Sequence, residues 1–119
     1  MRPPSGKRVL LLLRCAPQDP RAAQALRSAV GYLTADLQVT LVCCGPAAAL
    51  GRSYQADPAR LSAALRRPLD TLRAFGQPVY VYEEGGGDGG ADREAGDAAV
   101  LDADSLSALA RGAHAVISW

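Results

Sequence analysis

Hydrophobic and polar residues fall into short blocks along the chain, and these blocks predict strands separated by helices. Residues 9–13 form a continuous apolar run between charged flanks, which is typical of a central parallel strand covered on both faces. Residues 37–44 form a second run rich in β-branched side chains, and residues 79–82 form a third. Residues 98–101 and 115–119 have the pattern of two further short strands. The chain therefore supplies four or five strands.

The first interval between strands has helical periodicity. Asp19 and Pro20 have the residue types of an N-cap and a first helical position. Four apolar residues then follow at helical spacing: Ala23, Leu26, Val30 and Leu33. Gln24, Arg27 and Ser28 are expected to point outward. A strand, a helix and a second strand of these lengths predict a right-handed βαβ unit.

The later intervals predict three more helical segments. Residues 47–50 are expected to form a short helical turn, and a clearer helix should begin near Asp57. Pro68 lacks a backbone N–H, so we expect a kink there or a new short helix that Gly76 stops. Asp104 is expected to cap the last helix, with Gly112 just past its end and three apolar residues turned inward: Leu106, Leu109 and Ala110.

Strands that alternate with helices predict the α/β class, with a mainly parallel sheet of four or five strands in a three-layer sandwich. Residues 1–7 lack apolar periodicity and are expected to be a flexible N-terminal tail. Residues 83–97 are rich in glycine and acidic residues, which predicts a mobile surface loop. With 119 residues, the chain has the length of one globular domain, and we assign residues 8–119 to it.

Charge and hydropathy exclude several classes of function. The formal net charge is +1, so there is no general attraction for nucleic acid. The longest uninterrupted apolar run, residues 9–13, is far shorter than the roughly 20 residues that cross a bilayer and too short for a signal peptide. We therefore expect a cytoplasmic protein whose partners include neither nucleic acid nor membrane.

The sequence offers no motif for a metal or a nucleotide cofactor. It has three cysteines and one histidine but no Cys-x-x-Cys, whereas structural zinc takes four ligands. Residues 15–20 follow the first strand without the glycine turn of a dinucleotide site or the Gly-Lys-Ser/Thr of a P-loop. We expect no metal site and no cofactor.

The thiols are the main candidates for chemistry. Cys15 follows the first strand and precedes the helix that starts at Asp19 and Pro20, where the helix dipole favours a thiolate. Arg14 and Arg21 would add positive charge, so Cys15 is a candidate nucleophile and the two arginines candidate binding residues. The alternative is that Cys15 is a small buried apolar residue. We expect Cys43 and Cys44, which close the second strand, to be structural, and all three thiols to be reduced.

Both ends of the domain carry a family resemblance. Residues 8–17 end in an Ala-Pro pair, and residues 101–106 precede a helix and a closing strand with an aromatic last residue. These segments resemble the DsrE/DsrF-like (TusC/TusD-like) sulfur-relay family. The resemblance implies an α/β sandwich that forms homo- or hetero-oligomers with related small subunits. It also implies sulfur-carrier proteins as partners, in a pathway that passes sulfane sulfur between cysteines for tRNA thiolation or sulfur oxidation.

The chain departs from this family at one functional position. Active members carry a persulfide-forming cysteine after the third strand, but here residues 78–82 continue into Glu-Glu-Gly-Gly-Gly at 83–87. The first hypothesis is therefore a non-catalytic subunit or oligomeric assembly component of a sulfur relay. The second is a sulfurtransferase that carries a persulfide on Cys15. The third is a small-ligand or nucleotide-binding module in the crevice between the carboxyl ends of the first two strands.

Overall fold

The computed structural model describes residues 7–83 and 100–119, which form strands and helices in alternation. The strands are β1 (Arg8–Leu13), β2 (Gln38–Cys44), β3 (Val79–Tyr82), β4 (Val100–Leu101) and β5 (Ala115–Ser118). The α-helices are α1 (Pro20–Thr34), α2 (Ala48–Ala56), α3 (Ala63–Ala74) and α5 (Ala103–Gly112). Two single 3₁₀ turns, η1 (Gly45–Ala47) and η2 (Pro58–Arg60), flank α2. The predicted tail at 1–7 and loop at 83–97 lie almost wholly outside the described residues.

The five strands form one parallel sheet in the order β4-β3-β2-β1-β5, which confirms the predicted α/β class. β1 lies at the interior of the sheet, as its uninterrupted apolar run predicts, because β2 and β5 pair with its two edges. Leu10 is in register with Thr40 on one side and with Val116 on the other.

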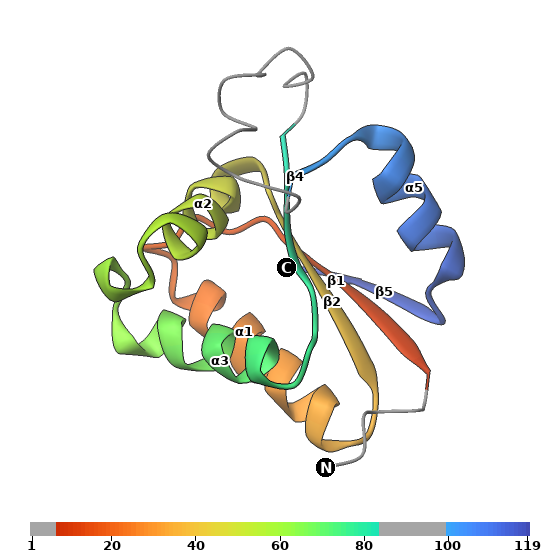
Figure 1. Cartoon of the computed structure of the whole chain (residues 1–119), viewed down its shortest axis with the longest axis horizontal. Coiled ribbons are helices and arrows are strands. Elements are labelled where there is room, and N and C mark those ends of the chain that lie inside the picture. The colour runs from red at the N-terminus through yellow and green to blue at the C-terminus, as the bar shows by residue number, and fades with distance from the viewer. Residues whose placement is uncertain (1–6, 84–99) are drawn as a thin grey trace.

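Helices cover the two faces of the sheet unequally (Figure 1). α1, α2 and α3 lie on one face, and α5 lies on the other. Strand order explains this division. The chain moves in one direction across the sheet from β1 to β2 to β3, whereas the connection from β4 to β5 returns to the opposite edge. Right-handed crossovers in opposite directions place their helices on opposite faces.

α1 packs against the sheet through small residues. Its N-cap is Asp19, as predicted, and the Arg21 backbone N–H donates to Asp19 Oδ1 over 2.9 Å. The predicted inward positions Ala23 and Val30 are only half-buried. Val30 lines the seam toward α3, since α1 packs beside α3 as well as on the sheet. The fully buried stripe is mostly alanine, which permits close approach to the strands: Ala22, Ala25, Leu26, Ala29 and Leu33.

α3 is one helix that continues across Pro68, where a kink or a new short helix was expected. Asp57 caps only the turn η2, and α3 begins at Ala63 with Pro68 inside it. Pro68 lies in the second turn, so its missing N–H leaves only the Ala64 carbonyl without its helical donor. Its side chain is buried. The predicted helix end is confirmed, because Gly76 follows the helix with φ of 74°.

The other two helices also differ from the sequence-based expectation. α2 extends beyond the predicted turn at 47–50 and ends at Ala56. In α5 the cap is Asp102, whose Oδ1 accepts a hydrogen bond from the Ser105 backbone N–H over 2.8 Å, and Asp104 lies in the first turn. Ala110, expected to point inward, is exposed. None of the helices in the described part of the chain has the length and apolar character that a bilayer crossing requires.

Gln77 joins the end of α3 to the start of β2. Its side chain is buried, its Oε1 accepts a hydrogen bond from the Val39 backbone N–H over 2.7 Å, and its Nε2 donates to the Phe75 carbonyl over 2.9 Å. The side chain therefore satisfies a buried backbone donor just before β3 begins to pair with β2.

Replacing Gln77 with leucine is expected to lower the free energy of unfolding by about 2 kcal/mol, because the Val39 N–H would stay buried without an acceptor. Urea denaturation of the purified protein measures this change. Gln24→Leu, on the exposed side of α1, is the matched control and should be nearly neutral. Equal effects of the two substitutions would contradict the bridging role of Gln77.

Candidate functional site

Cys15 lies at the carboxyl end of β1, but its side chain is not open to solvent. Only 6% of the residue is exposed, and it belongs to the apolar cluster between the sheet and the helices α1 to α3. The neighbouring Arg14 is exposed, and its backbone N–H donates to the Trp119 carbonyl over 2.7 Å. The backbone around Cys15 is therefore held by the last residue of the chain.

Arg21 is held by Asp19 rather than left free beside Cys15. Arg21 Nη2 lies 2.8 Å from Asp19 Oδ2. The hydrogen bond from the Arg21 side chain is the main reason why the pKa of Asp19 lies below its ordinary value. The pKa of Arg21 is raised chiefly by Asp19, and the charge of Cys15 acts in the same direction. The structure thus brings Arg21 near Cys15 while a carboxylate already neutralises it.

The two thiols that end β2 have different surroundings. Cys43 is fully buried, and burial raises the pKa of its thiol to about 12, with a smaller contribution from Cys44. Cys44 is half-buried, lies opposite Tyr82 of β3, and its Sγ lies 3.6 Å from the Leu13 carbonyl. Cys44 is therefore the most accessible of the three thiols.

In native protein at pH 8, iodoacetamide is expected to modify Cys44 before Cys15, by about an order of magnitude in rate, and to leave Cys43 unmodified. Peptide mass mapping after timed quenching gives the order. In urea the three thiols should react alike, which controls for intrinsic differences. Modification of Cys15 ahead of Cys44 would contradict the burial described above.

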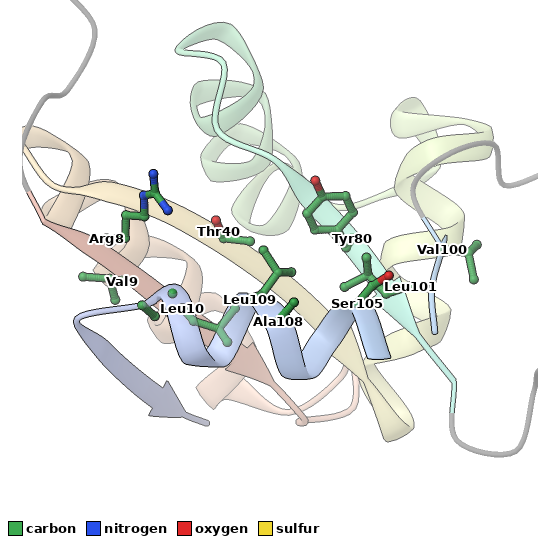
Figure 2. A pocket seen from close by; sticks show the side chains of 12 residues that line it. Arg8, Val9, Leu10, Thr40, Tyr80, Val100, Leu101, Ser105, Ala108 and Leu109 are labelled. Atoms are coloured by element: carbon green, nitrogen blue, oxygen red, sulfur yellow. The ribbon is translucent and has the colours of Figure 1, made fainter. Parts of the chain in front are cut away.

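A half-open cavity of about 490 Å³ lies on the other face, between the sheet and α5. Figure 2 shows Thr40 and Tyr80 on neighbouring strands, with Ala108 and Leu109 on the helix that runs across them. We call this space the α5 cavity. Most of its lining is apolar. Four side chains supply the polar part: Arg8, Thr40, Tyr80 and Ser105.

Strand register places these groups on one face. Leu10 is in register with Thr40, and Val42 is in register with Tyr80. Because residues two apart in a strand share a face, Thr40 and Val42 point to the same side, and all four side chains lie on the face that α5 covers. Arg8, Thr40 and Ser105 were not predicted from the sequence as site residues. The available signal was Thr40, a polar residue inside an otherwise apolar parallel strand.

The point at which the strand order changes direction is not where the ligand crevice was expected. The strand order reverses between β1 and β5, whereas the predicted crevice lay between the first two strands. Ligands of open parallel sheets bind outside the carboxyl ends at such a reversal. Trp119 lies there, half-buried, and its Nε1 is buried without a hydrogen-bond partner among the described residues. Within residues 7–83 and 100–119, no group of three or more His, Cys, Asp or Glu side chains is placed to hold a metal ion.

Comparison with known proteins adds no family to this description. The chain matches no protein-family model, and no curated protein sequence matches it.

Proposed function

We propose that this chain is a non-catalytic, DsrE/DsrF-like assembly component of an intracellular sulfur relay, which associates with a second copy of itself. The observation that carries the proposal is the unequal cover of the sheet. α1 buries five residues, whereas α5 buries none. In the described part of the chain, α5 is the single helix on its face (Figure 1).

The α5 side of the sheet carries the apolar surface that association would bury. Val116 of β5 is 49% exposed, although its register partner Leu10 is only 1% exposed. Parallel sheets are stable when both faces are covered, so a half-exposed valine on this face is a position that a partner can cover. Among the strands of residues 7–83 and 100–119, β5 also lies at an edge of the sheet, so a second copy can cover both Val116 and the strand edge.

The residues at the family's reactive position support a non-catalytic role. Glu83 follows β3, and its Oε2 forms an ion pair with Arg52 Nη2 of α2. A carboxylate cannot carry sulfane sulfur as a cysteine persulfide does. Cys15, the alternative carrier, is buried, and Arg21 beside it is paired with Asp19. These features favour the assembly role over the sulfurtransferase that uses Cys15.

Intact-protein mass spectrometry after treatment with inorganic polysulfide tests the non-catalytic assignment. A carrier thiolate would attack a sulfur of the polysulfide, form a Cys–S–SH group and release a shorter polysulfide. The native protein and Cys15→Ser are expected to show the same sulfur adducts, each measured relative to its own unmodified mass. A reducible sulfur adduct that Cys15→Ser alone removes, while Cys44→Ser retains it, would overturn the assignment and establish the sulfurtransferase alternative.

A further inference from the structure

We propose that the α5 cavity binds a small aromatic carboxylate. This inference does not depend on the sulfur-relay proposal, because it uses neither the thiols nor Val116. It rests on three features of the described residues: a cavity of suitable size, apolar walls that meet unused hydroxyl groups, and an arginine at one end without an acidic partner.

The size and the walls fit a small molecule. At about 490 Å³, the cavity lies within the roughly 300–1,000 Å³ of small-molecule sites. Leu10 forms a floor that is almost fully buried, and Leu101 of β4 and Leu109 of α5 face the same space. Figure 2 shows these side chains around the region between the sheet and the helix. Apolar walls of this kind favour a ligand with an apolar body.

The hydroxyl groups in the wall are available to a ligand. Thr40, Tyr80 and Ser105 line the cavity, and their hydroxyls form no hydrogen bond with any other residue of the described ranges. Tyr80 is half-buried and lies on the strand next to that of Thr40 (Figure 2). A tyrosine ring stacks on another aromatic ring, while its hydroxyl accepts or donates a hydrogen bond. These groups favour a ligand with an aromatic ring and a polar substituent.

Arg8 supplies the charge that selects a carboxylate. It lines the cavity where β1 begins, and its Nη1 lies 3.8 Å from the position that a Cβ on Gly112 would occupy. No acidic side chain in residues 7–83 or 100–119 forms an ion pair with it. A guanidinium matches the two oxygens of a carboxylate through parallel hydrogen bonds.

The side chain of Arg8 can be changed without removing its backbone contacts. Its backbone N–H donates to His114 Nδ1 over 3.0 Å, and its carbonyl accepts from the His114 N–H over 2.9 Å. Arg8→Gln retains both bonds. Arg111→Gln is the matched control, because Arg111 is an exposed arginine in the last turn of α5 that does not line the cavity.

The test is a ¹⁵N–¹H NMR titration with 4-hydroxybenzoate and, separately, with its neutral analogue 4-hydroxybenzamide. We expect 4-hydroxybenzoate to shift the backbone amide signals of Leu10, Thr40 and Leu109. It should bind about tenfold more tightly than 4-hydroxybenzamide. Arg8→Gln should remove this tenfold preference, whereas Arg111→Gln should keep it. Tyr80→Phe, which removes a single hydroxyl, should weaken 4-hydroxybenzoate binding about threefold.

Three results would overturn the proposal. The first is no shift of the lining amides with 4-hydroxybenzoate up to about 5 mM, above the range of a specific site. The second is equal affinity for the carboxylate and its amide. The third is equal loss in Arg8→Gln and Arg111→Gln, which would indicate general attraction by positive charge. Each result leaves the self-association proposal standing, because that proposal is tested by molar mass.

Discussion

Replacing Gly51 with alanine is expected to lower the free energy of unfolding by about 2 kcal/mol, although alanine is the better helix former. Gly51 lies in α2, where the helix passes very close to the sheet. A Cβ at this position would lie 2.6 Å from Val81 Cγ2 and 3.1 Å from Cys43 Cβ. Val81 has a restricted χ1 angle, and both Val81 and Cys43 are fully buried, so neither can yield without moving the helix.

Gly31→Ala provides the matched control with the opposite expected sign. Gly31 also lies inside a helix, α1, but a Cβ there would meet no atom within 4 Å. Alanine at this position should stabilise the protein by up to about 1 kcal/mol through helix propensity alone. Urea denaturation of both variants gives the two values. A destabilisation by Gly31→Ala, or a neutral Gly51→Ala, would contradict the close approach of α2.

The protein is expected to lose stability steeply above pH 9, and the buried thiol of Cys43 is the main reason. Burial raises the pKa of Cys43 from 9.0 to about 12. The folded state therefore keeps its proton where the unfolded chain releases it. The contribution of the protonated Cys43 thiol to the free energy of unfolding is complete below about pH 9. It is lost as the pH rises toward 12, by about 1.4 kcal/mol per pH unit.

Cys43→Ala separates this effect from other alkaline titrations. The variant should be less stable at pH 7 because it leaves a small cavity, but its stability should fall less steeply between pH 9 and pH 11. Burial also raises the pKa of Tyr54, and this contribution is common to both proteins. The difference between the two pH profiles, measured by urea denaturation, reports Cys43. Parallel profiles would show that Cys43 does not titrate differently in the folded state.

The strands were the most predictable part of the fold. Residues 79–82 are a strand with the predicted bounds, and the run at 9–13 lies at the interior of the sheet. Their apolar patterns come from burial on both faces, which leaves a strong signal in a single sequence. Helix boundaries were less predictable because they depend on competing caps. Asp102 and Asp104 both suit an N-cap, and Asp102 accepts the hydrogen bond from Ser105.

The continuity of α3 across Pro68 could not be predicted from the sequence. The missing N–H of Pro68 removes one helical hydrogen bond, to the Ala64 carbonyl, wherever the helix begins. The helix nevertheless runs from Ala63 to Ala74, with Pro68 buried inside it.

The candidate sites were less predictable than the fold because they depend on contacts between distant segments. Cys15 has the sequence context of an activated thiol, but Asp19, two residues before Arg21, binds the arginine that was expected to assist it. The α5 cavity requires the register of β2 and β3 together with the position of α5. Thr40 and Tyr80 are 40 positions apart in the sequence, and only the paired strands bring them onto one face.

Sedimentation velocity of the native protein, compared with Val116→Asp, tests whether the α5 side of the sheet is an assembly surface. Ala64→Asp is the control, since it places the same charge on an exposed position of α3 in the opposite layer. We expect an oligomer at micromolar concentration that Val116→Asp dissociates and Ala64→Asp preserves. A native protein that sediments as a strict monomer over this range would contradict it.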